Sequence, residues 1–494
     1  MNSLGACTLA LISGLAVAQT EPHIEQISAR LTPNDLKADV SFLASDLLQG
    51  RATPSHGLDI AAEYIAAQFR RAGLEPAGDD GYFQTAPYEN VTPKVEGMAL
   101  TLEMAGVTIK ADPESMAMQQ VFAADFSRVG LRKVRVANGA SLGAVLPDQA
   151  RGKVLVLDFA NPKMLMPTML ELAVLANRVQ PVLVVVLRAS GLPRNMAAGL
   201  REIPYASSTP VILVWDDAIR VALSSEEANL ADATISIHVP PPTVAQLKLR
   251  NVVGVLRGSD PTLRNTYVLV TAHYDHLGVC GIGDGDHICN GANDDASGTA
   301  SVIEIANTLS AQSVRPKRSI VFMTFFGEEL GLLGSRYYAT HPIFPPEETV
   351  ADVNLEQLGR TDVDGASSVG LLNVTGYDFS TLTDVLRKTG EAAGVQVVKN
   401  EQMNVRYFGG SDNQALAELG VPAHTLSVGY AFPDYHKPGD KWPKLDYNNL
   451  AKVDLAVALA VFRVANSVET PQWNRDIPNT QSYVKARQDS LSKP

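Results

Sequence analysis

Hydrophobic residues in the second half of the chain occur in short unbroken runs that alternate with segments of helical periodicity. The runs cover residues 251–258, 266–273, 319–327, 350–359 and 421–429. Because their apolar residues are continuous rather than alternating, we expect strands buried on both faces of a sheet. Between two of them, "TASVIEIANTLSAQ" (299–312) places Val302, Ile303 and Ala306 on one helical face. This alternation predicts an α/β fold, a three-layer α/β/α sandwich around a mostly parallel sheet.

The first half of the chain has a different pattern of hydrophobic and polar residues. "GLDIAAEYIAAQFRRAGL" (57–74) has apolar residues at helical spacing and ends at Gly73, a typical C-terminal stop. Farther along, "GKVLVLDF" (152–159) and "PVLVVVL" (181–187) predict strands of a smaller inserted α/β domain. "VPPPTV" (239–244) predicts a stiff linker after that domain.

Composition excludes some classes of function. The 494 residues include 53 acidic and 41 basic side chains, a formal net charge of -12, and no basic run stands out. A nucleic-acid partner is therefore not expected. No segment after the N-terminus approaches the roughly 18–20 continuous apolar residues that span a bilayer, so we expect no stable membrane span in the mature chain.

The N-terminus predicts export. Residues 1–19 carry no charge, and Ala16-Val17-Ala18 suits cleavage by signal peptidase, although no basic residue precedes the apolar core. We therefore predict a signal peptide and a secreted or periplasmic protein. Cleavage would remove one of the three cysteines and leave Cys280 and Cys289, a pair compatible with either a disulfide or two free thiols.

Metal-binding residue types follow several of the predicted strands. His273 and Asp275 lie just past one strand, Glu328 and Glu329 just past another, and Glu356 toward the end of a third. Ligands of open α/β sheets bind outside the carboxyl ends of the strands, so these side chains should converge. Each has an ordinary explanation alone, such as a solvated pair or a helix cap. Together, paired carboxylates after a buried strand need a cation to tolerate one another.

Two loops add candidates to this set: "NGANDDASGTA" (290–300) contains Asp294, and "PDYHKPGD" (433–440) contains His436. Together with "TAHYDHLG", "FFGEELGLLGSRYY" and "VNLEQLGR", they resemble the M28 family of co-catalytic zinc peptidases. The resemblance covers residues 251–468. The region before it resembles the protease-associated domain that is inserted in many members. The predicted segments are a signal peptide (1–19), an N-terminal helical part of the peptidase domain (20–93), a protease-associated-like domain (94–244), the zinc peptidase domain (245–470) and a C-terminal tail (471–494).

The resemblance implies two zinc ions per chain, bound at adjacent positions that share Asp294. It assigns His273, Asp294 and Glu356 to the first position, and Asp294, Glu329 and His436 to the second. Such oxygen-rich ligation with few imidazoles suits catalytic zinc. A non-proline cis peptide bond after the bridging aspartate is also expected from the family. Many relatives have aspartate in place of Glu356, and the longer side chain puts the geometry of that ligand in doubt.

The resemblance also implies roles around the metals. Asp275 would orient His273, Glu328 would be the general base, and Tyr435 would donate to the oxyanion, unless it is a packing residue. Asp412 and Tyr430 are candidates for substrate binding. The remaining residues near the site, namely His276, Asp284, Asp286 and His287, are interpreted as loop residues, and a Cys280–Cys289 bridge would staple that loop.

These features predict an exported exopeptidase that acts on peptide substrates, most simply an aminopeptidase. A carboxypeptidase-type relative would need a basic group near the site, for which Arg406 is a candidate. A glutaminyl-cyclase-like transferase would use one zinc, which the paired glutamates Glu328 and Glu329 disfavour. A binding protein without activity would be expected to have lost ligands. The sequence does not indicate an oligomeric state.

Overall fold

The computed structural model describes residues 21–492 except for short internal segments. These are residues 95, 121, 137–141, 160–168, 189–198, 204–208, 225–229, 282–283, 364–365, 402–403 and 431. The predicted signal peptide lies outside the described residues. The chain divides into two compact units, residues 1–86 with 249–494, and residues 87–248. It passes between them within β2 (Phe83–Thr92) and β12 (Thr243–Leu256).

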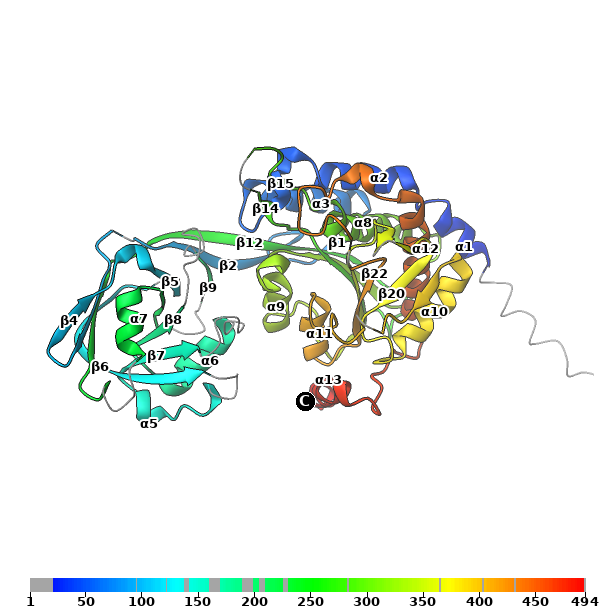
Figure 1. The fold of residues 1–494 in the computed structure, drawn as a ribbon. Coiled ribbons are helices and arrows are strands. Elements are labelled where there is room, and N and C mark those ends of the chain that lie inside the picture. The colour runs from blue at the N-terminus through cyan, green and yellow to red at the C-terminus, as the bar shows by residue number, and fades with distance from the viewer. Residues whose placement is uncertain are drawn as a thin grey trace, which may run out of the picture. The chain divides into compact units, whose positions relative to one another are not determined.

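The larger unit is built on a twisted sheet (Figure 1). Its strands run in the order β21 (Gln396–Val398), β20 (Leu371–Val374), β22 (Ala423–Ser427), β17 (Thr349–Leu355), β13 (Tyr267–His273), β16 (Ser319–Phe325) and β12. The four from β22 to β16 are mutually parallel, and β12 is antiparallel to β16. Every residue of β13, β16, β17 and β22 is buried, as their unbroken apolar runs predict.

Helices cover both faces of this sheet, which confirms the predicted α/β/α sandwich (Figure 1). One face carries α9 (Leu333–Thr340), α11 (Asn413–Glu418) and α13 (Gln481–Leu491). On the other face lie α2 (Pro33–Leu43), α3 (His56–Arg71), α8 (Ser297–Ser310) and α12 (Tyr447–Asn466), with α1 (Glu21–Ser28) and α10 (Leu382–Ala393) beside α12. The packing between α9, α11 and the sheet includes Tyr338, Leu416, Leu269 and Val321.

The helix predicted at residues 57–74 shows why the local sequence folds as it does. It forms α3, and the side chain of Ser55 caps its start by accepting from the backbone N–H of Leu58 at 3.0 Å. Apolar residues such as Ile65 and Phe69 are fully buried on its inner face. Gly73, with a φ of 74°, lies just past its end.

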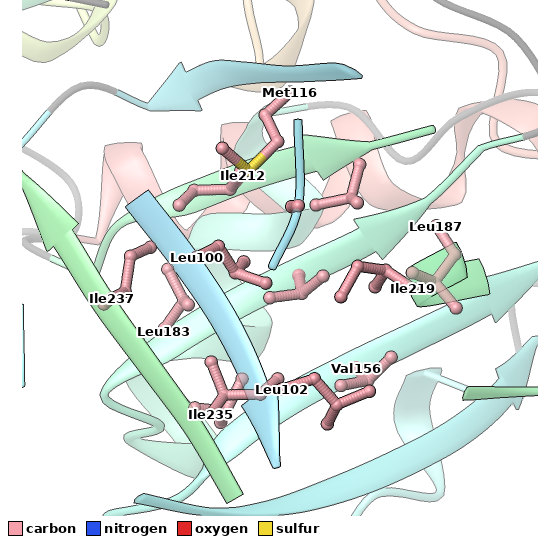
Figure 2. Close-up of a cluster of buried hydrophobic side chains, with 14 of the residues drawn as sticks. Leu100, Leu102, Met116, Val156, Leu183, Leu187, Ile212, Ile219, Ile235 and Ile237 are labelled. Carbon is pink, nitrogen blue, oxygen red and sulfur yellow. The ribbon is translucent and has the colours of Figure 1, made fainter. Parts of the chain in front are cut away.

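The smaller unit contains a second sheet, with helices α5 (Pro147–Ala150), α6 (Met169–Val179) and α7 (Asp217–Leu223). Its strand order is β4 (Val107–Lys110), β3 (Ala99–Met104), β11 (Thr234–Val239), β6 (Ala124–Val136), β7 (Val154–Phe159), β8 (Leu183–Leu187), β10 (Val211–Val214) and β5 (Met116–Gln120). Alternate residues of β7 face opposite cores: Val156 packs with Leu102 and Ile235 (Figure 2), whereas Leu155 packs with Leu175 of α6.

The linker predicted at residues 239–244 is shorter than expected. Val239 is the last residue of β11, and Thr243 already begins β12, so only residues 240–242 lie between the two strands. The three prolines join strands of two different sheets, because β11 pairs with β3 and β6 whereas β12 pairs with β16. Within the described part of the chain, no helix has both the length and the apolar character needed to cross a membrane.

Candidate metal centre

Three neighbouring strands bring acidic and imidazole side chains to one edge of the sheet. His273 is the last residue of β13, Glu356 directly follows β17, and Glu328 begins the short 3-10 helix after β16. His273 is paired in register with Phe325, the last residue of β16. Because these strands are parallel, the residues that follow them lie at the same edge, where ligand sites of such sheets occur.

The imidazole of His273 lies between two carboxylates. Its Nε2 atom is 3.3 Å from Oδ1 of Asp294, and its Nδ1 atom is 3.5 Å from Oδ1 of Asp275. Asp275 is fully buried and also accepts from the Thr53 hydroxyl at 3.0 Å and from the backbone N–H of Glu328 at 3.1 Å. Asp275 is therefore fixed behind His273, on the opposite side of the ring from Asp294.

Asp294 lies in a distorted segment whose backbone is held by a second aspartate. The peptide bond between Asp294 and Asp295 is cis. The buried carboxylate of Asp440 accepts from the backbone N–H groups of Asn293 and Asp294 at 3.0 and 3.1 Å. Asp295 turns the other way and accepts from the N–H groups of Gly298 and Gln357. These contacts fix the direction in which the Asp294 carboxylate points.

The two oxygens of Asp294 face different histidines. Oδ1 faces His273, and Oδ2 lies 3.2 Å from Nε2 of His436. The same His436 nitrogen is 3.4 Å from Oε2 of Glu329. Burial opposes ionisation of Asp294, but the adjacent His273 and His436 rings hold the pKa of this carboxyl well below its usual range. An ionised carboxylate between two such groups is suited to bridge two cations.

Glu356 completes the group around His273. Single ligand atoms of His273, Asp294 and Glu356 lie within 4.8 Å of one another, a spacing compatible with one metal ion. Burial and the neighbouring charge of Asp294 raise the pKa of Glu356 to about 7. The sequence left open whether a glutamate could replace the aspartate of many relatives at this position. The 4.8 Å spacing shows that the Glu356 carboxylate does lie with His273 and Asp294.

Glu328 lies beside the ligands but belongs to neither metal-compatible group, one formed by His273, Asp294 and Glu356 and the other by His276, Asp294 and Glu329. It is partly exposed, and its backbone N–H is anchored on Asp275. Burial raises the pKa of Glu328 well above its usual range, and the negative charge of Glu356 acts in the same direction. A carboxyl that gains a proton this readily, next to a metal site, has the properties expected of a general base.

The donor set fits a metal centre. Both ring nitrogens of His273 and the Oε1 atom of Glu329 are buried, and no hydrogen-bond partner for them occurs among the described residues. Burial also raises the pKa of Asp295 well above its usual range, and the nearby carboxylates of Glu356 and Asp294 act in the same direction. Buried imidazole nitrogens and clustered carboxylates are costly unless a cation satisfies them. Imidazole and carboxylate are the ligands that zinc accepts in catalytic sites.

The structure places the other predicted site residues as follows. Tyr435 is 41% exposed, and its ring stacks on His436 with 3.8 Å between ring centroids. Tyr430 stacks on Tyr407 at 5.4 Å, and its hydroxyl is buried with no hydrogen-bond partner in the described chain. Asp412 is fully buried directly before α11, and its side chain makes no capping bond to that helix. Their roles toward substrate stay predictions.

His276 is the residue that the sequence interpretation underestimated. It does lie in a loop, but its side chain is buried, and its Nδ1 atom lies 2.6 Å from Oε1 of Glu329. Residues 274–277 form no regular element, so no periodicity in the sequence placed this side chain at the site. The only available signal was its place three residues after His273.

Arg51 supports the loops of the site from the protein interior, and it was not identified from the sequence. Its fully buried guanidinium donates to the backbone carbonyls of Tyr274, Asn290 and Gly291 at 2.8, 2.7 and 3.0 Å, and also to Leu43. These carbonyls belong to the loops that carry His273 and Asp294. Nothing in the local sequence "LLQGRATP" (47–54) distinguishes this arginine from a surface residue.

The loop between the two groups of ligands is cross-linked. A disulfide joins Cys280 to Cys289, and the short strands β14 (Gly278–Val279) and β15 (Ile288–Cys289) pair next to it. The loop returns to Asn290, whose side chain donates to the backbone carbonyl of Ala44 and to Asp46, each at 2.9 Å. The disulfide therefore closes this loop, and the Asn290 hydrogen bonds fix the end of the loop to the segment that follows α2.

The fold and the site together define an α/β protein whose clustered imidazole and carboxylate side chains could hold metal at one edge of the sheet. Residues 251–461 match the family model described as Peptidase family M28. This part of the chain is an M28 peptidase domain, as the sequence motifs predict.

Curated relatives align with part of the chain. Aminopeptidase YwaD of Bacillus subtilis (strain 168) is 27% identical over 230 residues, which cover 45% of this chain and 46% of that protein. A probable zinc metalloprotease of Pyricularia oryzae is 31% identical over 212 residues, 40% of this chain and 38% of that protein. The chain thus spans less than half the length of each of these relatives.

Solved structures extend the likeness of the fold to most of the chain. An aminopeptidase from Aneurinibacillus sp. strain AM-1 superimposes with a TM-score of 0.56 and 20% identity. The superposition covers 91% of this chain and all of the other. At this identity the likeness concerns the fold, and the chemistry depends on the residues described above.

Proposed function

We propose that the protein is a zinc-dependent aminopeptidase with two metal positions that share Asp294. The observation that carries this proposal is the direction of the two Asp294 oxygens, one toward His273 and the other toward His436. His273 and Glu356 complete the first ligand group, and Glu329 and His436 complete the second. The names of the relatives, an aminopeptidase and a probable zinc metalloprotease, support the same chemistry.

Zinc held by these residues supplies a Lewis acid that polarises a peptide carbonyl and makes a bound water more acidic. Glu328 would take the proton of the attacking water, since its carboxyl lies beside the proposed ligands and belongs to neither of the metal-compatible groups described above. The raised pKa of Glu328 lets it hold that proton and then give it to the leaving amine. Asp275 keeps His273 oriented throughout because its carboxylate stays on the far side of the ring.

Tyr435 is the proposed donor to the oxyanion that forms on the substrate carbonyl. It precedes His436, stacks on that ring, and keeps part of its surface exposed, so substrate can reach it. Its hydroxyl remains protonated at neutral pH, because burial and the charge of Asp294 raise the pKa of Tyr435. A protonated phenol is the state that can donate a hydrogen bond to developing negative charge.

Export is part of this proposal. The uncharged N-terminal 19 residues support it, and so does the Cys280–Cys289 disulfide, a kind of cross-link that persists in oxidising compartments. N-terminal sequencing of protein recovered from outside the producing cytoplasm tests it. A mature chain that begins after Ala18 is the expected result, and an intact Met1 would contradict it.

The aminopeptidase proposal is tested with matched peptide substrates and chelation. Purified protein is assayed on aminoacyl arylamides, on the same compounds N-acetylated, and on peptides whose C-termini are amidated. We expect cleavage that requires a free N-terminal amine, tolerates the C-terminal amide, stops with chelator and returns with zinc. Cleavage that requires a free carboxylate would instead indicate a carboxypeptidase, for which the exposed Arg406 next to Tyr407 is the candidate anchor.

A further inference from the structure

His276 lies at the second metal position, although neither its sequence context nor the ligand set assigned above requires it there. Its Nδ1 atom is 2.6 Å from Oε1 of Glu329, and the ring is almost completely buried. Single ligand atoms of His276, Asp294 and Glu329 all lie within 4.8 Å of one another. The ring of His436 meets that of His276 edge-on, with 5.6 Å between centroids.

The short contact between His276 and Glu329 does not have the geometry of a hydrogen bond. Neither ring nitrogen of His276 nor Oε1 of Glu329 has a hydrogen-bond partner among the described residues. A ring N–H aimed at that oxygen would satisfy both groups at this distance. Two polar atoms that approach closely while directed elsewhere are typical of ligands that point at a common cation.

The backbone around this ring is shaped to admit it. Gly291 adopts a φ of 58°, and a β-carbon there would lie 2.5 Å from Cγ of the His276 ring. Any other residue at Gly291 would therefore displace the imidazole from Glu329. The loop that carries Asp294 begins at this glycine, so the same backbone turn presents Asp294 and makes room for His276.

We infer that His276 is a fourth protein ligand of the second metal position, beside Asp294, Glu329 and His436. The inference rests on the proposed function, because it assigns a further ligand to the same centre. The first position, with His273, Asp294 and Glu356, keeps room for water and substrate. A zinc position with four protein ligands is closed, whereas a catalytic one has three and an open place. An ion held by four protein ligands would therefore be the more tightly retained, and the first position, with three, would leave a place for water or substrate.

The test counts ligand imidazoles directly. The full-length protein is stripped of metal, loaded with two equivalents of Co²⁺, and studied by proton NMR in water. Each imidazole bound to Co²⁺ gives one exchangeable ring N–H signal that is shifted far outside the ordinary range. We expect three such signals, from His273, His276 and His436. Two signals from protein with both cobalt ions bound would overturn the assignment of His276 and leave the proposed function standing.

Variants identify the signal and measure its consequence. His276→Ala should remove one shifted signal and weaken binding of the more tightly held ion by about 100-fold in competition with a chelator. His56→Ala changes an exposed histidine at the start of α3 and should retain all signals and the affinity. An unchanged set of signals in His276→Ala would overturn the inference. If that variant does not fold, the count in the unmodified protein still decides. Protein that binds no cobalt would overturn both this inference and the proposed function.

Discussion

The guanidinium of Arg51 donates from Nε to the backbone carbonyl of Tyr274 at 2.8 Å, in the interior of the protein. The other nitrogens of the same group bind carbonyls of Asn290 and Gly291. No carboxylate forms an ion pair with Arg51 among the described residues. One buried cation thus joins two loops by their backbones, and burial lowers its pKa only to about 10, so it stays charged at neutral pH.

Arg51→Lys should therefore destabilise the protein despite the retained charge. Lysine has no planar fork, so it cannot donate to carbonyls on both loops, and buried carbonyls without donors cost about 1–3 kcal/mol each. We expect a lower midpoint of thermal unfolding for the metal-free protein and weaker zinc binding. Calorimetry and chelator competition measure the two effects. The exposed Arg264→Lys is the matched control, and equal behaviour of the two variants would refute this role.

Glu328→Gln tests the general base. The change removes the proton acceptor but leaves the backbone N–H that bonds Asp275, and it touches neither metal-compatible group. We expect kcat to fall by about 10²–10⁴-fold with unchanged zinc content. Activity is followed on the best arylamide substrate and zinc by elemental analysis of the same sample. Glu391→Gln, on the exposed surface of α10, should behave as the unmodified protein. Substantial turnover by Glu328→Gln would exclude it as the base.

Asp294 and Glu356 should differ in how many ions they hold. Asp294→Asn weakens both positions, because each of its oxygens faces a different histidine. Glu356→Gln weakens only the first position, so about one zinc per chain should remain after dialysis. Zinc content at a fixed free concentration of the metal distinguishes the two variants. Equal losses in both would contradict a shared ligand.

A buried pair of acids, Asp39 and Glu304, should make stability depend on pH. Burial raises the pKa of Asp39 to about 6 and that of Glu304 to about 7, and the negative charge of Asp39 also raises the pKa of Glu304. The folded state therefore binds protons more tightly than the unfolded state does. Stability from this pair is present below about pH 4 and is lost as the pH rises through about 6–7.

Glu304→Gln removes one of these charges and should raise the thermal unfolding midpoint at pH 8 more than at pH 5. The change leaves untouched the Tyr64 hydroxyl, which donates to Asp39 at 2.6 Å in the unmodified protein. Thermal unfolding at both pH values measures the difference, with the exposed Glu391→Gln as control. A shift of the same size at pH 5 and pH 8 would show that the charge of Glu304 is not responsible.

The sequence predicts the strand-end ligands because their positions follow from topology. Once β13, β16 and β17 are recognised as buried parallel strands, His273, Glu328 and Glu356 must lie at one edge. Loop residues obey no such rule, since loop conformation depends on distant partners. His276 and Arg51 take their places through contacts across about 50 and 220 residues. The predicted linker around residue 240 is too long, because extended proline segments and strands have similar backbone geometry and the sequence does not mark where one ends and the other begins.

The passage of the chain through β2 and β12 has a consequence for how this protein can change over time. These strands are neighbours in the sheet, so the 162-residue smaller unit (87–248) leaves and rejoins the peptidase unit at adjacent points. A short hairpin between the same two strands would close the sheet equally well. The smaller unit can therefore lengthen, shrink or be exchanged for another without altering the order of the strands that carry the ligands. Natural or engineered replacement of residues 87–248 would therefore leave the strands that carry the ligands in place.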